Sequence, residues 1–313
     1  MLHEIAITPS VFKTDSYASR EVCDAEIRGV QRELLNRFVI RNGYEGRWYK
    51  QLWANKTESP NEAQKLLKAL KVKGRIRPFQ AVSNSIPLDS VAWCKEALAS
   101  HRIEALSGIL SCSTIKLEHR EERLVCPIQR RDGAKTWWNT ILEQGSHRVR
   151  RTTEGYLGAL GVYLKHASHI VFMDPHLDPT KPGYQDFYKI IEAIGNRSGP
   201  KPLIEIHRIC IDGISDRSVP SEEEWKQRFR GELSSVLTNS ELNIEVFIWP
   251  DEHDRHFLTN LGGLHLGNSL KVNRNPNDVS TWSRLDNAAV EDLTRKFDAG
   301  TNPPNHRFKI LER

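Results

Sequence analysis

Residues 244–270 read IEVFIWPDEHDRHFLTNLGGLHLGNSL, a β-branched and aromatic stretch that continues into a polar segment and then into glycines. The alternation over Ile244–Trp249 predicts a strand that ends before Pro250. Polar residues at a strand end of an open α/β sheet are placed to bind a ligand. If the chain stays extended, His253 and Arg255 share one face. An imidazole beside a guanidinium, followed by glycines that let the backbone come close, suits an oxyanion such as phosphate.

This spacing resembles the phospholipase D superfamily, whose half-site reads H-x-K, four residues, D, six residues and a glycine pair. The family's histidine, lysine, aspartate and glycine-pair positions are occupied here, in that order, by His253, Arg255, Asn260 and Gly267-Asn268. The resemblance covers about residues 150–275 and implies a phospholipase D-like mixed-sheet layer domain. It implies chemistry without a metal or other cofactor: the histidine attacks phosphorus, a second motif's histidine protonates the leaving oxygen, and the carboxylate steadies the imidazole.

A single motif supplies only one of the two histidines, so the resemblance also implies a homodimer that joins two half-sites across a twofold axis. The substituted positions point towards binding without turnover, because Arg255 is a clamp of different geometry and Asn260 offers no charge to an imidazolium. The retained His253 and Gly267 point towards hydrolysis. A third interpretation places His253 and Arg255 in a structural salt-bridge cluster with the neighbouring acidic residues.

The second half of the chain alternates helices with strands, which indicates an α/β domain. The expected elements are a helix over 153–165, a strand over 169–173, a helix over 185–194, a strand over 203–211, a helix over 222–237 and the strand over 244–249. The polar, basic segment GSHRVRR at 145–151 is interpreted as a boundary. We therefore predict two domains, residues 1–145 and 146–313.

The first half is predicted to be a separate α+β domain, and no family resemblance indicates its role. Its expected elements are a strand within 4–13, helices over 19–39, 59–70 and 90–100, and strands within 103–117 and 124–128. Residues 1–150 carry 25 Lys and Arg against 17 Asp and Glu, whereas residues 151–313 carry 20 against 23. The basic half is therefore expected to contact a polyanion.

Two groups of cations in this half are candidate phosphate contacts. Extended chain over 71–77 would place four cations on one face, namely Lys71, Lys73, Arg75 and Arg77. A solvated edge strand has the same pattern. The second group is Arg130 and Arg131, which with Lys135 precede Trp137-Trp138 in a combination typical of single-strand binders. Adjacent tryptophans equally serve to anchor a core, and that alternative stays open.

Composition and cysteine usage set the remaining expectations. With 38% hydrophobic and 27% charged residues the chain is expected to fold rather than to be disordered. Neither a secretory signal nor an apolar run near the ~18 residues of a membrane span is visible. Five cysteines without a C-x-x-C pair predict a reducing, cytoplasmic environment. His207-Arg208 is expected to be a bonded pair within a strand, and metal-ligand spacing is lacking at His176, His256 and His265.

Two hypotheses for function follow. In the first, the chain is a nucleic-acid-binding phospholipase D-like protein with metal-independent nuclease activity. It would belong to a prokaryotic antiviral defence or mobile-element system, with the basic half guiding the substrate and other proteins as partners. In the second, the same fold binds an anionic ligand, a lipid headgroup or a partner protein without cleaving it. The sequence favours nucleic-acid binding and does not distinguish DNA from RNA.

Overall fold

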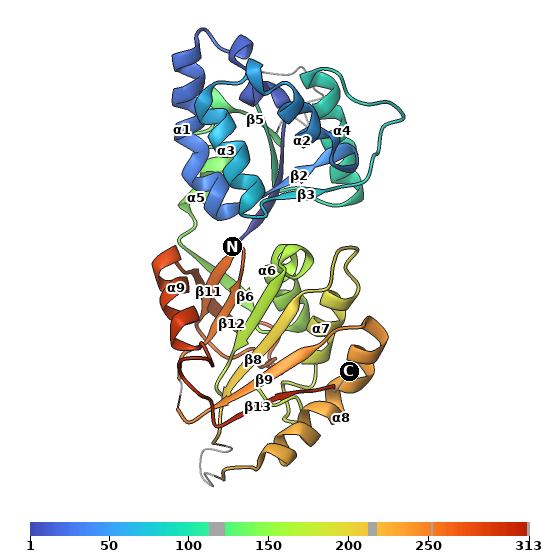
Figure 1. Cartoon of the computed structure of the whole chain (residues 1–313), viewed down its shortest axis with the longest axis vertical. Helices are drawn as coiled ribbons and strands as arrows, with labels where there is room; N and C mark the ends of the chain where they lie inside the picture. The colour runs from blue at the N-terminus through green and yellow to red at the C-terminus, as the bar shows by residue number, and fades with distance from the viewer. Residues whose placement is uncertain (113–122, 212–217, 252, 312–313) are drawn as a thin grey trace. The chain divides into compact units, whose positions relative to one another are not determined.

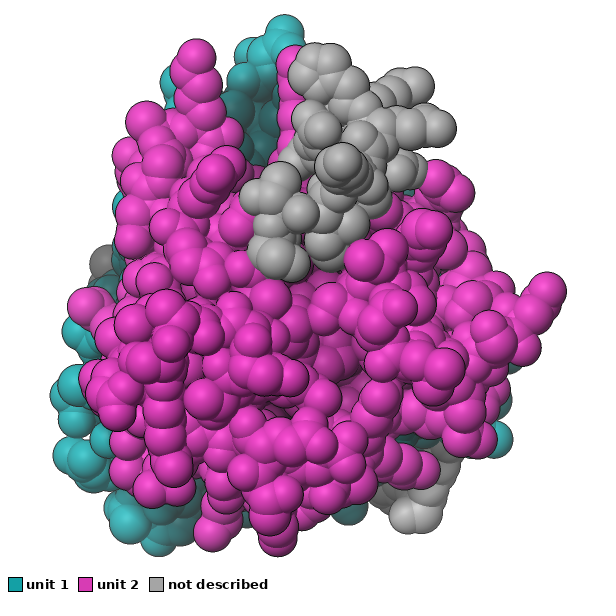
Figure 2. Space-filling view, turned by 90° about the horizontal axis from the view of Figure 1, so that it is seen from above, with its two compact units in different colours: residues 1, 145–313 teal, residues 2–144 magenta. Residues whose placement is uncertain are grey.

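The computed structural model describes residues 1–112, 123–211, 218–251 and 253–311. These residues form a mixed α/β structure with one sheet of five strands and one of eight. Each sheet belongs to its own compact unit (Figure 1): unit 2 comprises residues 2–144, and unit 1 comprises residue 1 and residues 145–313. Figure 2 colours unit 1 teal and unit 2 magenta. In the described ranges, no helix has both the length and the apolar character needed to cross a bilayer.

Unit 2 alternates helices with strands throughout. Its elements are, in chain order, β1 (His3–Ile7), the 3-10 helices Pro9–Phe12 and Thr14–Ser16, α1 (Arg20–Arg37), β2 (Phe38–Asn42), α2 (Gly43–Ala54), the 3-10 helix Lys56–Glu58, α3 (Asn61–Val72), β3 (Ile76–Pro78), α4 (Ser90–Ile103), β4 (Gly108–Ser111), β5 (Val125–Pro127), the 3-10 helix Ile128–Arg130 and α5 (Trp137–Glu143). The strand order is β3-β2-β1-β4-β5, and every neighbouring pair is parallel. The expected α+β class is therefore wrong for this half, which is a parallel α/β layer.

Helices cover both faces of this sheet, as a parallel sheet requires. In Figure 1, α1, α3 and α5 lie on one side of the strands and α4 lies on the other. Side chains alternate accordingly along β1: Ile5 and Ile7 belong to the larger core cluster with α1 and α3, whereas Ala6 packs with α4. Short strands such as β2 are buried along their whole length, so they lack the polar alternation by which a half-exposed strand is recognised.

Phe38 lies at the centre of the larger core and is fully buried. Its ring stacks on Trp138 with the ring centroids 5.0 Å apart, and it meets Trp137 edge-on at 6.2 Å. Trp138 is itself only 1% exposed. The tryptophan pair therefore anchors the core, which is the structural alternative that the sequence left open.

The segment after Asn42 differs from the sequence-based expectation. The helix expected to continue to residue 39 ends at Arg37, and the apolar run that follows is strand β2. A short apolar run of this kind has no period that separates a helix from a buried strand. The chain then enters α2, which the sequence analysis did not predict, through three left-handed residues: Tyr44 (φ 52°), Glu45 (φ 55°) and Gly46 (φ 85°).

Unit 1 contains the stretch that resembles a phospholipase D motif. Its elements are β6 (Ser146–Arg150), α6 (Thr153–His166), β7 (His169–Met173), α7 (Phe187–Gly195), β8 (Leu203–Ile209), α8 (Glu222–Ser240), β9 (Ile244–Trp249), β10 (His256–Thr259), β11 (Gly262–Leu266), β12 (Val279–Arg284), α9 (Asn287–Lys296) and β13 (His306–Lys309). β7 and β9 have the predicted bounds. The segment expected to be a polar boundary forms the edge strand β6, which pairs with β12.

The eight strands follow the order β13-β9-β8-β7-β10-β11-β12-β6. β7, β8 and β9 are parallel, and the strands from β10 to β6 continue the sheet in antiparallel fashion. Figure 1 shows α6, α7 and α8 on one side and α9 on the other. Phe172 accordingly meets Phe187 of α7, with ring centroids 5.2 Å apart, whereas Val171 and Met173 belong to the cluster that packs with α9.

One edge of this sheet collects loops from four distant parts of the chain. Because β10 is antiparallel to β7, with His256 opposite Met173, the residues before β10 meet the residues after β7. The end of β6 likewise meets the start of β12, with Arg150 opposite Val279. We call this the Asp174 edge, after the residue that follows β7.

Candidate functional site

Asp174 is fully buried and organises the edge named after it. Its carboxylate accepts hydrogen bonds from the backbone N–H groups of His176 at 3.1 Å and Leu270 at 2.9 Å. It also accepts one from the hydroxyl of Tyr184 at 3.1 Å. A buried carboxylate needs such donors to offset the loss of water. Asp174 therefore ties the loop after β7 to the loop after β11.

Asp178 is a second buried carboxylate whose charge is compensated within the protein. Arg228 Nη1 donates to its Oδ2 at 2.9 Å, and the Thr180 hydroxyl donates to its Oδ1 at 2.7 Å. Arg208 Nη1 lies 4.0 Å from the same carboxylate and its guanidinium lies 3.6 Å from the Trp225 ring centroid. The Asp178 carboxylate is therefore paired within the fold and supplies no partner for the remaining cation of this edge.

That cation is Arg255, which immediately precedes β10. Its side chain is half-buried, and its Nε atom is buried without a hydrogen-bond partner. Within the described ranges, no carboxylate forms an ion pair with the Arg255 guanidinium. Burying part of a charged group without a partner carries a cost that a bound anion would remove. Arg255 is therefore the group at this edge best placed to bind an anion.

His176 and Tyr184 lie close to Arg255. Burial lowers the pKa of His176; the Asp174 carboxylate opposes this effect, and the positive charges of Arg255 and Arg208 reinforce it. Burial also raises the pKa of Tyr184, and the neighbouring Asp174 charge adds to the shift. At neutral pH the site therefore presents a neutral imidazole and a protonated phenol beside the Arg255 guanidinium, which has no ion pair in the described part of the chain.

His253 lies at the same edge but is mostly exposed, with 78% of its side chain accessible. Its Nε2 atom is 3.0 Å from Asp251 Oδ1. The charge of His253 acts on the pKa of His176, so the structure brings these two histidines and Arg255 near one another. The expected shared strand face is not formed, because β10 begins only at His256 and residues 253–255 precede the strand.

Asn260 lies at the other end of β10. Its Oδ1 accepts hydrogen bonds from the backbone N–H groups of Ser168 at 2.8 Å and His169 at 3.3 Å, at the start of β7. Asn260 is the fifth residue after Arg255 along largely extended chain, which corresponds to roughly 15 Å. The contact with the imidazole of His253, which the family resemblance implies at this position, is therefore not formed. Asn260 instead fastens the β10–β11 turn to β7.

Gly267 and Asn268 are exposed and lie at the Asp174 edge, where β11 ends. Gly267 N donates to the carbonyl of Thr281 at 3.1 Å, and a Cβ atom at Gly267 would lie 2.4 Å from that oxygen. This glycine is thus required by the close approach of β12. The residues that follow it provide the Leu270 N–H that binds Asp174.

The four cations over 71–77 do not form the predicted track. Lys71 is in the last turn of α3, Lys73 follows the helix, and the strand begins only at Ile76. Arg75 is buried, whereas Arg77 is half-buried and burial lowers its pKa. A helix end and a turn at Gly74 break the alternation, so the four side chains do not share a strand face.

The second basic group is also divided. Arg130 is exposed, but Arg131 forms an ion pair with Glu26 of α1 and donates to the Ile128 carbonyl at 2.8 Å. Arg131 therefore fastens the segment after β5 to α1. Of the predicted contacts in this group, only Arg130 and Lys135 present exposed cations.

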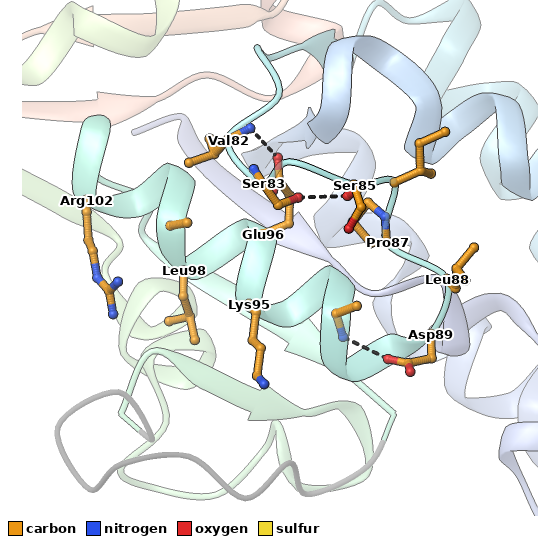
Figure 3. Close-up of a pocket in the computed structure, with 13 residues that line it drawn as sticks. Val82, Ser83, Ser85, Pro87, Leu88, Asp89, Lys95, Glu96, Leu98 and Arg102 are labelled. Carbon is orange, nitrogen blue, oxygen red and sulfur yellow. Dashed lines mark hydrogen bonds between the residues drawn. The ribbon is translucent and has the colours of Figure 1, made fainter.

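Unit 2 has a hollow of about 680 Å³ between α4 and the loop that leads to it (Figure 3). The buried carboxylate of Glu96 accepts hydrogen bonds from the N–H groups of Val82 and Ser83, both at 2.8 Å. Asp89 caps α4 by accepting from Ala92 N, also at 2.8 Å. Both carboxylates thus hold the loop and the helix in place, and we assign no chemistry to this hollow.

His207 is a buried histidine whose two ring nitrogens are both bonded. Trp249 Nε1 donates to His207 Nδ1 at 3.0 Å, and His207 Nε2 lies 3.1 Å from Glu205 Oε2. The acceptor role of Nδ1 places the proton on Nε2, so the neutral imidazole donates to the Glu205 carboxylate. Burial lowers the pKa of His207. For Glu205, burial alone would raise the pKa, but the hydrogen bonds of His169 and His207 lower it to about 2.

These shifts predict two separate pH windows for the stability of unit 1. A histidine with a lowered pKa stabilises the fold above its unfolded pKa of about 6.5, and this contribution is lost as the pH falls below it. Glu205 stabilises the fold above about 4.3, and its contribution is lost as the pH falls towards 2. In His207→Phe, the slope of the unfolding free energy against pH should therefore be smaller below pH 6.5, by up to about 1.4 kcal/mol per pH unit.

Urea unfolding at pH 7.5, 6.5 and 5.5 measures this difference in slope. His306→Phe is a control, because His306 is a partly exposed histidine in the same unit. A slope below pH 6.5 that is the same in wild type and His207→Phe would contradict the assignment.

In the described part of the chain, no group of three or more His, Cys, Asp or Glu side chains is placed to hold a metal ion. Comparison of the sequence with protein-family profiles and with curated proteins finds no match.

Among solved structures, polyphosphate kinase from Porphyromonas gingivalis aligns with 57% of this chain at 14% identity and a TM-score of 0.33. This chain covers only 30% of that protein. TrmBL2, an archaeal chromatin protein with a novel mode of DNA binding, aligns over 90% of this chain and 99% of its own at 13% identity, with a TM-score of 0.30. At these TM-scores neither likeness defines the fold or the ligand of this chain.

Sequence reasoning singled out Arg255 and His253 but missed the groups packed around them. Asp174 and Tyr184 lie outside the motif, and His176 was weighed only as a metal ligand. A signal was present, because Asp174-Pro175-His176 directly follows a predicted strand. Loops at strand ends of one sheet edge meet in space even when they are distant in sequence.

Proposed function

We propose that unit 1 binds the phosphodiester backbone of a nucleic acid at the Asp174 edge. The observation that carries this proposal is the Arg255 guanidinium, which is half-buried and has no ion pair within the described ranges. The buried carboxylates of the same sheet edge, Asp174 and Asp178, already accept internal hydrogen bonds. The planar fork of an arginine matches two oxygens of a phosphate.

Binding without cleavage is the form of the proposal that this geometry supports best. The exposed His253 has Asp251 beside its Nε2 atom, and Asn260 lies at the opposite end of β10. The lowered pKa of His176 leaves it neutral, which does not suit a group that must protonate a leaving oxygen. Nuclease activity, a homodimer and a place in a defence system stay predictions from the sequence.

The test is the affinity of the full chain for fluorescein-labelled DNA and RNA oligonucleotides, measured by fluorescence anisotropy. Arg255→Ala should weaken binding roughly 10- to 150-fold, the equivalent of about 1.5–3 kcal/mol for a hydrogen bond to a charged group. Arg255→Lys should recover part of the affinity, because it retains the charge without the fork. Arg295→Ala removes an exposed cation of α9 and should leave the affinity unchanged.

Equal affinities of wild type and Arg255→Ala would refute the proposal, as would preferential binding to vesicles of anionic lipid. The same samples, incubated with and without EDTA, test for cleavage. Cleavage that survives EDTA and is lost in His253→Ala would establish the nuclease form. Static light scattering with and without oligonucleotide tests the homodimer.

A further inference from the structure

We infer that the ligand of the Asp174 edge is a single strand, which continues from Arg255 into a groove lined by Arg151, Lys271 and Arg274. This inference rests on the proposed function and names its substrate class. The groove has a volume of about 660 Å³. It is formed by the residue after β6, the loop after β7 and the loop between β11 and β12. All three segments lie at the same sheet edge as Arg255, as the pairing of the strands requires.

As around Arg255, the carboxylate of the groove is paired within the protein, whereas its exposed cations have no ion pairs among the described residues. Its carboxylate, Asp186, accepts a hydrogen bond from the Thr153 hydroxyl at 2.8 Å and lies 3.0 Å from Lys189 Nζ. Lys271 and Arg274 are exposed, and in the described part of the chain neither side chain forms an ion pair. The negative group of the groove is thus compensated from within the fold, and two cations face solvent alone.

Arg151 completes the wall of the groove. Its Nη1 donates to Asp278 at 2.9 Å and its Nη2 donates to the Lys271 carbonyl at 3.4 Å, whereas its Nε is buried without a hydrogen-bond partner. Arg151 therefore fixes the backbone that carries Lys271. Its role is to position that loop, and Lys271 and Arg274 are the groups expected to contact phosphates.

The loop after β7 connects the groove to the surroundings of Arg255, and hydrogen bonds hold this loop to the one after β11. The Asp174 carboxylate accepts from Tyr184 and from Leu270 N. Next along the chain, Val272 N donates to the Gly183 carbonyl at 2.8 Å. Gly183 has φ +90°, and a Cβ atom there would lie 2.5 Å from the Lys271 side chain, so the two loops touch. The loop after β7 thus runs from the Arg255 site, at His176 and Tyr184, to the wall of the groove, at Gly183 and Asp186.

The dimensions favour one strand over a duplex. The groove has a volume of about 660 Å³, which is in the range of pockets that enclose one small ligand. A duplex is much wider than such a pocket, because its major groove alone is about 12 Å wide. No aromatic residue lines the groove, so bases have no stacking platform there. We therefore expect contacts to successive phosphates and little preference among bases.

The experiment measures the affinity of the full chain for single-stranded oligonucleotides of two, four, eight and twelve nucleotides across a salt series. Affinity should rise with length in wild type. Lys271→Ala with Arg274→Ala should leave dinucleotide binding unchanged and weaken the longer strands. Loss of two phosphate contacts should flatten the slope of log affinity against log salt by about 1.4 on single strands.

Arg295→Ala with Lys309→Ala is the matched control, since it removes two exposed cations on α9 and β13. It should keep the wild-type slope. Equal affinities for the dinucleotide and the twelve-nucleotide strand, or an unchanged salt slope in the groove variant, would show that the ligand does not extend into the groove. The proposal that Arg255 binds phosphate would still stand. Failure of Arg255→Ala to affect any length would instead overturn the proposed function. Competition by polyglutamate as effective as that by an oligonucleotide would assign the groove to an acidic protein.

Discussion

Asp174→Asn is expected to lower the unfolding free energy of unit 1 by roughly 3–5 kcal/mol and to abolish nucleic-acid binding. One carboxylate oxygen accepts from His176 N and the other from Leu270 N and Tyr184. An asparagine places an NH2 group against at least one of these donors. Each lost hydrogen bond to the charged group costs about 1.5–3 kcal/mol, and the orphaned buried donors add to it.

Urea unfolding, followed by tryptophan fluorescence and circular dichroism, measures the first effect, and anisotropy with a labelled oligonucleotide measures the second. Asp286→Asn is the matched control, because Asp286 caps α9 by accepting from Ala289 N at 2.8 Å and asparagine caps helices equally well. The control should change stability by only a few tenths of a kcal/mol. A loss below about 1 kcal/mol in Asp174→Asn would show that the carboxylate does not organise this edge.

Phe38→Ala should destabilise unit 2 by about 3–5 kcal/mol. The side chain is fully buried at the start of β2 and stacks on Trp138, so truncation leaves a cavity between the sheet, α1 and α5. The rigid indoles of Trp137 and Trp138 have little freedom to fill it. The cost therefore belongs in the upper part of the range observed for large-to-small changes in cores.

Urea unfolding with a near-UV circular dichroism signal reports on this core. Val72→Ala, at a position 79% exposed at the end of α3, is a control that should change the unfolding free energy by less than about 0.5 kcal/mol. A loss of less than 1 kcal/mol in Phe38→Ala would mean that the aromatic cluster repacks freely.

Elements with a clear period were predicted well from the sequence. The strand bounds of β7 and β9 match, and α6 and α8 begin at the expected residues. The acidic start of α8 is a capping box formed by Ser221 and Glu224, a local signal that sequence carries directly. The parallel sheet of unit 2 was missed because its strands are short and two of them, β2 and β4, are buried along their whole length, so they show no alternation.

The candidate site was predicted only in part, and the reason is geometric. Arg255 and His253 are close in sequence and were singled out together. Asp174 and Tyr184 reach Arg255 through the antiparallel pairing of β10 with β7, which a one-dimensional motif does not contain. Spacing also misplaced Asn260, because a four-residue strand carries it to the opposite edge of the sheet.

Ligand binding at the Asp174 edge depends on the folding of unit 1, because distant segments of the chain assemble this edge. Its parts come from Arg151, from the loop after β7, from Arg255 and from the loop that ends β11, so it exists only when β6 and β10–β12 have closed onto β7. A collapsed intermediate with intact helices but without these antiparallel strands would bind nothing. Affinity thus depends on the complete sheet, and a ligand present at a hundred times its Kd would stabilise folded unit 1 by about 2.7 kcal/mol.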